Sequence, residues 1–300
     1  MLPFLTKQLY PEPFQSKFYD MKEFWGNINS NLQQVSKLQK AMAKLNDMSD
    51  IHITEQLKMS FVYHSNALEG SNLSLEDTIA FLQEDIIDER NSAEDYLDAL
   101  GQAAAMGFIE SSLRCGESID RTLVCEINDL LTKHNESIPS RAEKAVASGT
   151  YKIEPNAVQL SDGEVVECIA PELVPSEMEE LFAYCETSNA HPVVKAAIAH
   201  YNFVRIHPFQ HGNGRGARIL MSLILQHYHL PPAVIQVQDK EKYLDCLHRA
   251  NQGNILPFIG FVADSLIQTM QMVLETDRAT QQTVEQQQRS AKRNIWAVLF

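Results

Sequence analysis

Helical periodicity runs through most of this chain and limits its fold more than any other feature. Residues 28–48, for example, carry apolar side chains every three or four positions and contain neither glycine nor proline, which is the pattern of an amphipathic helix. The same pattern recurs over residues 54–68, 74–83, 93–113, 120–133, 177–184, 191–205, 214–229 and 240–251. The sequence therefore predicts a mainly α-helical bundle.

One stretch, residues 149–167, has the pattern of β-strands instead. Valine-containing runs lie on either side of Ser161-Asp162-Gly163, and an Asp-Gly pair between such runs is typical of a hairpin. We expect one small β-hairpin here, packed against the helices. An ordinary hairpin that only covers the core would have the same sequence pattern.

The charge and the apolar pattern exclude some partners. The chain has 39 acidic and 25 basic residues, for a net charge of −14, which opposes nonspecific attraction to nucleic acid or anionic lipid. Its longest strongly apolar run, residues 219–225, is shorter than the roughly 18 residues that a membrane span needs. The sequence therefore predicts no membrane segment and no nucleic-acid binding by the main body.

The cysteines and the N-terminus indicate a cellular location. The five cysteines are scattered and lack the short paired spacings of zinc or redox sites. The first residues lack the basic start and long apolar run of a secretory signal. A cytoplasmic protein is expected, although an effector delivered by a specialised secretion system would have the same features.

A glycine-rich segment, residues 206–218, lies between two helical patterns. Three glycines in five positions would be costly inside a helix, so this segment predicts a loop that enters a helix N-terminus. The backbone N–H groups of Gly212, Asn213 and Gly214 would then form an anion-binding concavity. The helix dipole and Arg215 would strengthen it.

Two further features bear on this segment. Arg218 lies about one helical turn after Arg215, so the two guanidinium groups could bind different phosphates of a polyphosphate. A simpler alternative is that the Gly-Asn-Gly turn only connects two helices. A zinc site is another alternative, because His207 and His211 are four residues apart; a proline and a glycine nearby argue against the continuous helix that it needs.

The segment from His207 to Arg218 resembles the motif of the Fic proteins, His-x-Phe-x-(Asp/Glu)-Gly-Asn-Gly-Arg-x-x-Arg, and matches every defined position except one. The similarity covers roughly residues 60–270, and Gly149-Thr150-Tyr151-Lys152 is similar to the start of the family's flap. The resemblance implies a Fido-type helical bundle with a β-hairpin flap at about residues 149–167.

The same resemblance implies how the chain is divided. Residues 56–275 would form the Fic catalytic core, and residues 1–55 an N-terminal helical extension. Residues 276–300 are polar with an apolar end; they would form a solvated helix or a linker. Such an end could begin a further, winged-helix domain, which would be the one route to nucleic acid.

The activity that the resemblance implies is adenylylation, the transfer of AMP from ATP to a Ser, Thr or Tyr hydroxyl of a target protein, with Mg²⁺ or Mn²⁺. His207 would be the general base. The amides of residues 212–214 would stabilise the transferring phosphoryl group, and Arg215 and Arg218 would hold the β- and γ-phosphates.

The resemblance also implies contacts around this centre. By similarity, Tyr243 and Asn251 would lie on the adenine side; a packed tyrosine and a capping asparagine are the alternatives. The target protein would dock on the flap by strand addition. A homodimer through an exposed helix face is a further expectation.

A second segment, Ser65-Asn66-Ala67-Leu68-Glu69-Gly70, resembles the inhibitory motif (Ser/Thr)-x-x-x-Glu-(Gly/Asn) of Fic proteins. It would lie in a helix over about residues 60–70. The resemblance implies that Glu69 pairs with Arg218, which would block productive ATP binding, and that Glu69 could also assist removal of AMP from the target. A surface helix with no such role is the alternative.

The motif departs from the family at His211, where the family has Asp or Glu as the magnesium ligand. Magnesium prefers oxygen, whereas imidazole favours softer ions. Three interpretations follow: transfer with a metal held mainly by ATP and water, with a preference for manganese; transfer of a different group; or a nucleotide-binding regulatory module with weak transfer. The first is favoured because the base, the anion site and both arginines are present.

Overall fold

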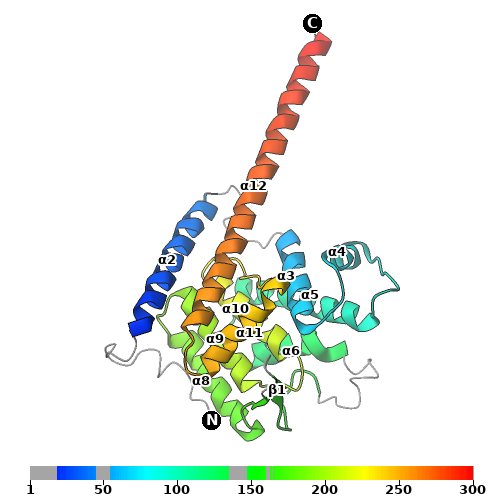
Figure 1. Cartoon of the computed structure of the whole chain (residues 1–300). Helices are drawn as coiled ribbons and strands as arrows, with labels where there is room; N and C mark the ends of the chain where they lie inside the picture. The colour runs from blue at the N-terminus through cyan, green and yellow to red at the C-terminus, as the bar shows by residue number, and fades with distance from the viewer. Residues whose placement is uncertain (1–18, 45–54, 135–146, 160–162, 164, 300) are drawn as a thin grey trace.

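The computed structural model describes residues 19–44, 55–134, 147–159, 163 and 165–299. Ten α-helices and a two-stranded sheet are found in this part of the chain, which confirms the predicted mainly α-helical fold (Figure 1). The helices are α2 (Tyr19–Met42), α3 (Glu55–Glu69), α4 (Leu75–Glu84), α5 (Ala93–Cys115), α6 (Arg121–Thr132), α8 (Val174–Thr187), α9 (Pro192–Ile206), α10 (Asn213–His227), α11 (Lys240–Asn251) and α12 (Leu256–Leu299). Short 3₁₀ turns precede two of them, η2 (Pro171–Leu173) and η3 (Val237–Asp239).

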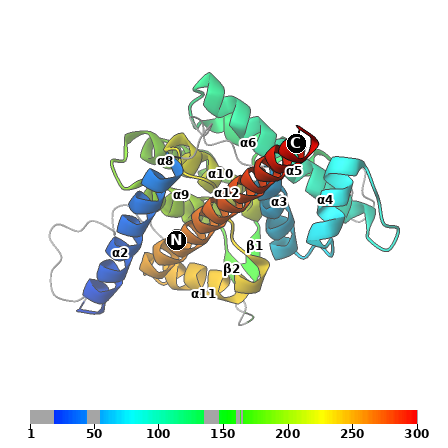
Figure 2. The ribbon, with the colours of Figure 1, turned by 90° about the horizontal axis from the view of Figure 1, so that it is seen from above.

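Helices α9 and α10 form the centre of the core. Thirteen of the fifteen residues of α9 and twelve of the fifteen of α10 are buried, so both helices are covered on nearly every side. Helices α8 and α12 pack against α9, and α3, α5 and α6 pack against α10. Figure 2 shows α2 on one side of α12 and α4 on the other. The loop between α9 and α10 therefore connects the two most buried helices of the fold.

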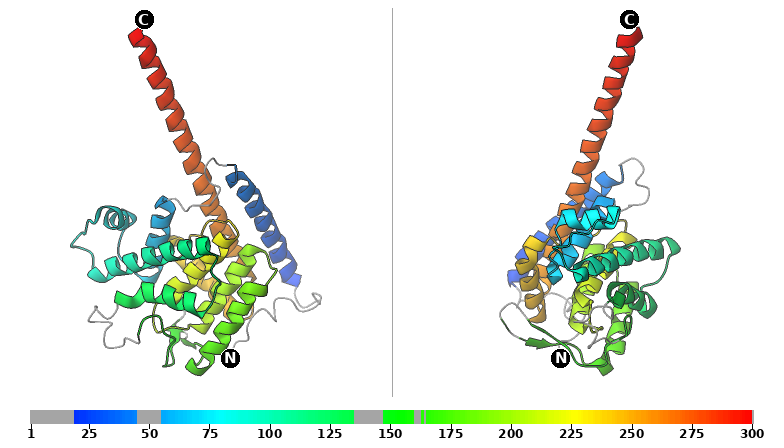
Figure 3. Two further views of the ribbon diagram at one scale, coloured as in Figure 1. Left: turned by 180° about the vertical axis from the view of Figure 1, so that it is seen from behind. Right: turned by 90° about the vertical axis from the view of Figure 1, so that its right-hand side faces the viewer.

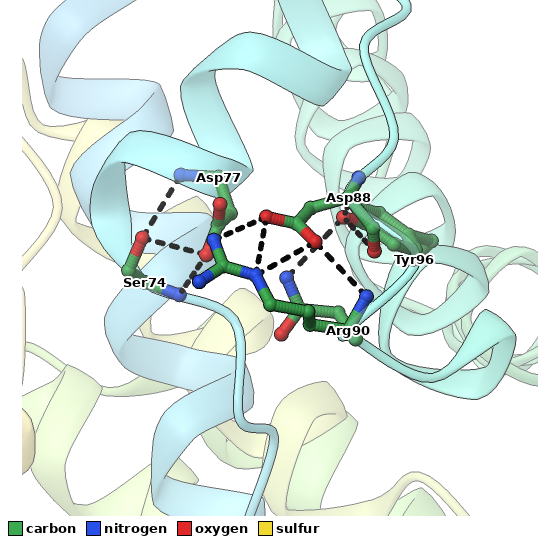
Figure 4. Close-up of polar contacts among 6 residues, drawn as sticks. Ser74, Asp77, Asp88, Arg90 and Tyr96 are labelled. Carbon is green, nitrogen blue, oxygen red and sulfur yellow. Dashed lines mark hydrogen bonds and ion pairs between the residues drawn. The ribbon is translucent and has the colours of Figure 1, made fainter.

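The connection from α3 to α5 is fixed by polar caps (Figure 4). Ser74 caps α4 in a capping box, its hydroxyl accepting from the Asp77 amide at 3.0 Å. The Asp88 carboxylate binds Arg90, and the Tyr96 hydroxyl accepts from the Asp88 amide at 2.8 Å. These contacts cap α4 and order the loop that leads from α4 to α5.

The expected hairpin is present, with short strands. β1 (Ala157–Gln159) pairs antiparallel with β2 (Val165–Glu167), with Val158 opposite Val166. Ser161 and Asp162, on which the prediction of the turn rested, lie outside the described residues, whereas Gly163 has a positive φ of 88°. Tyr151 lies before the strands and packs its ring against Phe209, 5.5 Å between centroids.

Helix α12 is 44 residues long, and its C-terminal part extends beyond the other helices (Figure 3). Residues 276–294, expected to be a solvated helix or a linker, are helical. Residues 256–278 are long and apolar enough to cross a membrane by composition, but 67% of the apolar window is buried inside the protein, as expected of a core helix. Residues 1–18 and 45–54 of the expected N-terminal extension, and Phe300, lie outside the described residues.

Candidate active site

A cavity of about 590 Å³ opens beside the start of α10. Its walls come from the end of α3, strand β2 and the chain after it, α9, and helices α10 and α11. Its polar lining residues are Glu69, Glu167, Cys168, Tyr201, Arg205, His207, Arg218, Lys240, Tyr243, His248 and Asn251. Half of the predicted site residues therefore line one cavity: Glu69, His207, Gly214, Arg218, Tyr243 and Asn251.

The glycine-rich segment has the predicted form, a loop that enters a helix. Gly212 caps α10 with a φ of 80°, and a Cβ there would lie 2.9 Å from the Thr132 Cγ2 atom. The Asn213 side chain binds both backbone groups of Phe209, at 2.9 Å to the N–H and 2.8 Å to the carbonyl. Glycine is thus required by both backbone conformation and space, and Asn213 has a structural role in fixing the loop.

His207 ends α9 in the left-handed conformation, with a φ of 51°. Its Nδ1 atom lies 3.3 Å from the Val204 carbonyl, so the tautomer with a proton on Nδ1 donates there and leaves the Nε2 lone pair available. Burial lowers the pKa of His207 to about 4, and Lys152 acts in the same direction despite the opposing Val204 contact. The half-buried imidazole is therefore neutral near pH 7 and can accept a proton.

The structure brings Glu69 and Arg218 together. The Arg218 Nη2 atom donates to the Glu69 Oε1 atom at 2.6 Å and to the Ser65 carbonyl at 2.9 Å, and Nε donates to the Ser65 hydroxyl at 2.9 Å. Burial alone would raise the pKa of the Glu69 carboxyl, but the Arg218 guanidinium lowers it overall. Arg218 is only 2% exposed, so little water reaches its guanidinium group. Glu69 of α3 balances its positive charge.

The Glu69 carboxylate also lies against the first turn of α10. A Cβ added to Gly214 would lie 2.3 Å from the Glu69 Oε1 atom. A helix N-terminus attracts anions because its first N–H groups point outward and its dipole is positive there. The carboxylate therefore takes a position suited to a phosphate oxygen. Gly70, which follows the motif Glu, has a φ of 104° and ends α3.

Arg215 differs from its sequence-based interpretation. It was expected to hold a phosphate, but it does not line the cavity; its Nη1 atom binds the Asp98 carboxylate of α5 at 2.9 Å. The Arg215 side chain is 7% exposed. Arg215 lies on the side of α10 that faces α5 and not α11. Its guanidinium group therefore forms an ion pair that joins α10 to α5.

Tyr243 and Asn251 both line the cavity, from α11. The Tyr243 hydroxyl interacts with Arg218 and with the His200 Nε2 atom at 3.1 Å, so Tyr243 lies near the arginine end. The Asn251 Oδ1 atom accepts from the Tyr201 hydroxyl at 2.9 Å. Asn251 is therefore bound to α9 through its side chain, and does not cap a helix N-terminus.

The residues present do not fit a magnesium ion held by the protein at the motif position. His211 supplies an imidazole, not a carboxylate, and it does not line the cavity; its carbonyl accepts from the Asn128 side chain at 2.9 Å. Within the described ranges, no group of three His, Cys, Asp or Glu side chains could hold a metal ion. The zinc alternative with His207 and His211 thus lacks a third ligand in this part of the chain.

Two positions were not found by sequence reasoning. Lys240, at the start of α11, lines the cavity and its charge acts on Glu69. Lys152 is buried below the flap, where it contacts the loop that carries His207. Of these two lysines, only Lys152 had a signal in the sequence, because it is the last residue of the segment Gly149-Thr150-Tyr151-Lys152 that is similar to the start of the flap.

Comparisons with known proteins agree with this geometry. Residues 118–225 match the model of the Fic/DOC family. The chain is 32% identical over 206 residues to protein adenylyltransferase fic-1 of Caenorhabditis elegans, and 30% identical over 254 residues to protein adenylyltransferase Fic of Aedes aegypti. These alignments cover 68% and 81% of this chain but only 38% and 48% of the two relatives, so the chain spans less than half of their length.

Solved structures share the fold. A Fic-domain signalling protein from Bacteroides thetaiotaomicron superimposes with a TM-score of 0.72 at 27% identity, over 83% of this chain and 97% of that one. Fic-1 from C. elegans superimposes with a TM-score of 0.69 at 26% identity, over 84% of this chain and 73% of that one. The predicted Fido-type fold is confirmed, and the chain contains a domain of the Fic/DOC family.

Proposed function

We propose that the chain is a protein adenylyltransferase that moves AMP from ATP to a hydroxyl of a target protein and is held inactive by Glu69. The observation that carries the proposal is the cavity in which a neutral histidine, a helix N-terminus and a buried arginine meet. Relatives named protein adenylyltransferases support the reaction class.

Each part of the site has its own role in the proposed reaction. The His207 Nε2 atom takes the proton from the target hydroxyl while its oxygen attacks the α-phosphate. The new P–O bond forms as the bond to the β-phosphate oxygen breaks, and pyrophosphate leaves. N–H groups at the start of α10, beside Gly214, stabilise the charge on the transferring group. Arg218 binds the terminal phosphate once Glu69 has released it, whereas Arg215 lies outside the cavity.

Glu69 holds the site closed because it uses both elements that ATP phosphates need. It pairs with Arg218 at 2.6 Å and covers Gly214 at the helix N-terminus. A charged hydrogen bond of this kind contributes about 1.5–3 kcal/mol. We also propose that, after release, the same carboxylate activates water for removal of AMP, which makes de-adenylylation a second activity of one pocket.

The target docks on the flap. Strand β2 and the chain after it line the cavity, and in the described part of the chain the sheet has only two strands, so a peptide can pair with its edge. Val165 on the flap is 61% exposed, which suits an apolar contact with that peptide. The homodimer and the cytoplasmic location expected from the sequence stay predictions.

The test is labelling with ATP radioactive at the α-phosphate, with Mg²⁺ and with Mn²⁺. We expect little label in the wild-type protein, strong label in Glu69→Gly, and none in Glu69→Gly/His207→Ala, with ATP affinity unchanged within about threefold between the last two. Glu55→Gly is the matched control, because it places glycine at the other end of α3, away from Arg218. It should behave as wild type.

Two outcomes would overturn the proposal. Equal labelling of wild type and Glu69→Gly would remove the inhibitory role. No labelling of Glu69→Gly with either metal, despite measurable ATP binding, would favour the nucleotide-binding regulatory module, which the imidazole of His211 at the metal-ligand position also suits.

A further inference from the structure

The chain just before the flap binds the backbone of the loop that carries His207. The Lys152 amide donates to the Pro208 carbonyl at 2.9 Å, and its Nζ atom donates to the Ile206 carbonyl at 3.3 Å. The Asn156 Nδ2 atom donates to the Phe209 carbonyl at 3.1 Å. Carbonyls on both sides of His207 are thus held by two residues of a different segment.

Lys152 is an unusual side chain for this position. It is 2% exposed, and its Nζ atom binds the Asn156 Oδ1 atom at 2.5 Å and a carbonyl oxygen. Burial lowers the pKa of Lys152 to about 8. A buried ammonium costs several kcal/mol unless its hydrogen bonds compensate, so a lysine here indicates a task that an apolar side chain could not perform.

That task is set by the backbone of His207. A residue other than glycine in the left-handed region costs about 1–2 kcal/mol, and such a conformation persists only when the surrounding structure fixes it. This conformation ends α9 and directs the chain into the loop that leads to Gly212 at the start of α10. Without bonds to its neighbours, the loop would relax and move the imidazole.

We infer that Lys152, together with Asn156, is a positioning residue that holds His207 in its left-handed conformation and links it to the flap. The link exists because the Asn156 carbonyl accepts from the Cys168 amide at 3.1 Å, directly after β2, and β1 begins at Ala157. A peptide that pairs with the flap therefore acts on the same residues that fix the base. The inference rests on the proposed role of His207 as base.

The kinetic test uses Glu69→Gly protein to remove inhibition. Adding Lys152→Met should lower the maximal labelling rate by on the order of 10- to 100-fold, because misplacing a reacting group by about 1 Å has that effect, while the ATP concentration for half-maximal rate stays within about threefold. Lys152→Arg keeps the charge and the donors and should restore most of the rate. Asn156→Ala should give an intermediate loss.

Lys195→Met is the matched control for loss of a buried lysine. Lys195 is 3% exposed, and its Nζ atom binds the Cys185 carbonyl at 3.0 Å and the Tyr228 hydroxyl at 2.8 Å, away from the cavity. If Lys152 acts only through stability, the two methionine variants will lose labelling rate in parallel with thermal stability. That result would overturn the inference.

A second measurement does not depend on transfer. In full-length protein with labelled histidines, the imidazole signal of His207, assigned with His207→Gln, should shift in Lys152→Met and stay in place in Lys195→Met. An unmoved signal in folded Lys152→Met would overturn the inference. If Glu69→Gly shows no transfer at all, the proposed function fails, but a signal that also shifts in Asn156→Ala, which removes no charge, still supports the positioning of His207 by this pair.

Discussion

At the scale of single residues, Gly214 decides what can lie at the start of α10. The position is helical, where alanine is favoured over glycine by about 1 kcal/mol. Here, however, a Cβ would lie 2.3 Å from the Glu69 Oε1 atom and 3.4 Å from the Arg218 Nη1 atom. Only glycine at position 214 leaves room for the Glu69 carboxylate. Substitutions at Gly214 and Glu69 should therefore be energetically coupled.

We expect Gly214→Ala to lower the free energy of unfolding by about 1–2 kcal/mol in the wild type, because the new methyl group displaces a charged hydrogen bond. In Glu69→Gly the same change should be neutral or stabilising by up to about 1 kcal/mol. Urea denaturation of the four proteins of this cycle measures the coupling.

Gly107→Ala provides the control, since this α5 glycine has only the Lys58 Nζ atom, at 3.8 Å, near its added Cβ. It should change stability equally in both backgrounds. If Gly214→Ala also changes stability equally in both, then Glu69 does not occupy the start of α10 in solution.

The sequence motif predicted where several of the site residues lie, whereas their roles stay predictions. His207, Gly212 and Arg218 lie where the motif implied, because local spacing decides which residues share a loop and a helix turn. Arg215 lies against Asp98 and not in the cavity, because helical spacing cannot tell which neighbouring helix a side chain faces; its phosphate role stays a prediction. Asp98, its partner, is 117 positions away, and no local pattern connects the two.

At the scale of elements, the Arg215–Asp98 pair joins α10 to α5. Both side chains are largely buried, with 7% and 17% exposed. Removing one member of such a pair leaves the other charge buried without its partner. The pair therefore contributes to the docking of α10, the helix whose N-terminus forms the anion site.

Asp98→Ala should lower the free energy of unfolding by about 2–4 kcal/mol, and Asp98→Leu/Arg215→Met should recover most of it. ATP affinity, measured in Glu69→Gly protein, should change less than about threefold in the double variant, whereas Arg218→Ala should weaken it strongly. If the double variant binds ATP as poorly as Arg218→Ala does, then Arg215 does bind a phosphate of ATP.

Among the elements, several helix boundaries were predicted to within a few residues, as for α4 (expected over 74–83) and for α10 (expected over 214–229), whose start is marked by Gly212. Helix α12 was not foreseen as one helix of 44 residues. The change to polar composition near residue 276 indicated a separate segment there, either a solvated helix or a linker. A helix can cross such a change in composition, and the apolar first part of α12 packs in the core.

At the scale of the whole molecule, buried histidines couple folding to pH. Burial lowers the pKa of His200 to about 3 and that of His207 to about 4. In the unfolded chain a histidine has a pKa of about 6.5, so the unfolded state binds more protons as the pH falls below that value. Stability is therefore present near neutral pH and is lost as the pH falls through this range.

The free energy of unfolding should thus decrease between about pH 7 and pH 5, by on the order of 2 kcal/mol for His200 alone, because each pKa unit corresponds to 1.36 kcal/mol. Urea denaturation at several pH values measures it. His200→Gln should flatten the dependence, and the exposed His227, changed to Gln, serves as control. An unchanged slope in His200→Gln would show that His200 is not the source.

If Glu69 inhibits as proposed, its contact with Arg218 also defines two populations, one closed and one able to bind ATP productively. The apparent dissociation constant is then the intrinsic one divided by the competent fraction. A contact of about 2 kcal/mol would leave about 3% of the molecules competent. The ratio of ATP affinities in wild type and Glu69→Gly therefore counts the competent molecules. Any activating partner must bind that population preferentially. If the partner raises the affinity for ATP by a given factor, ATP raises the affinity for the partner by the same factor.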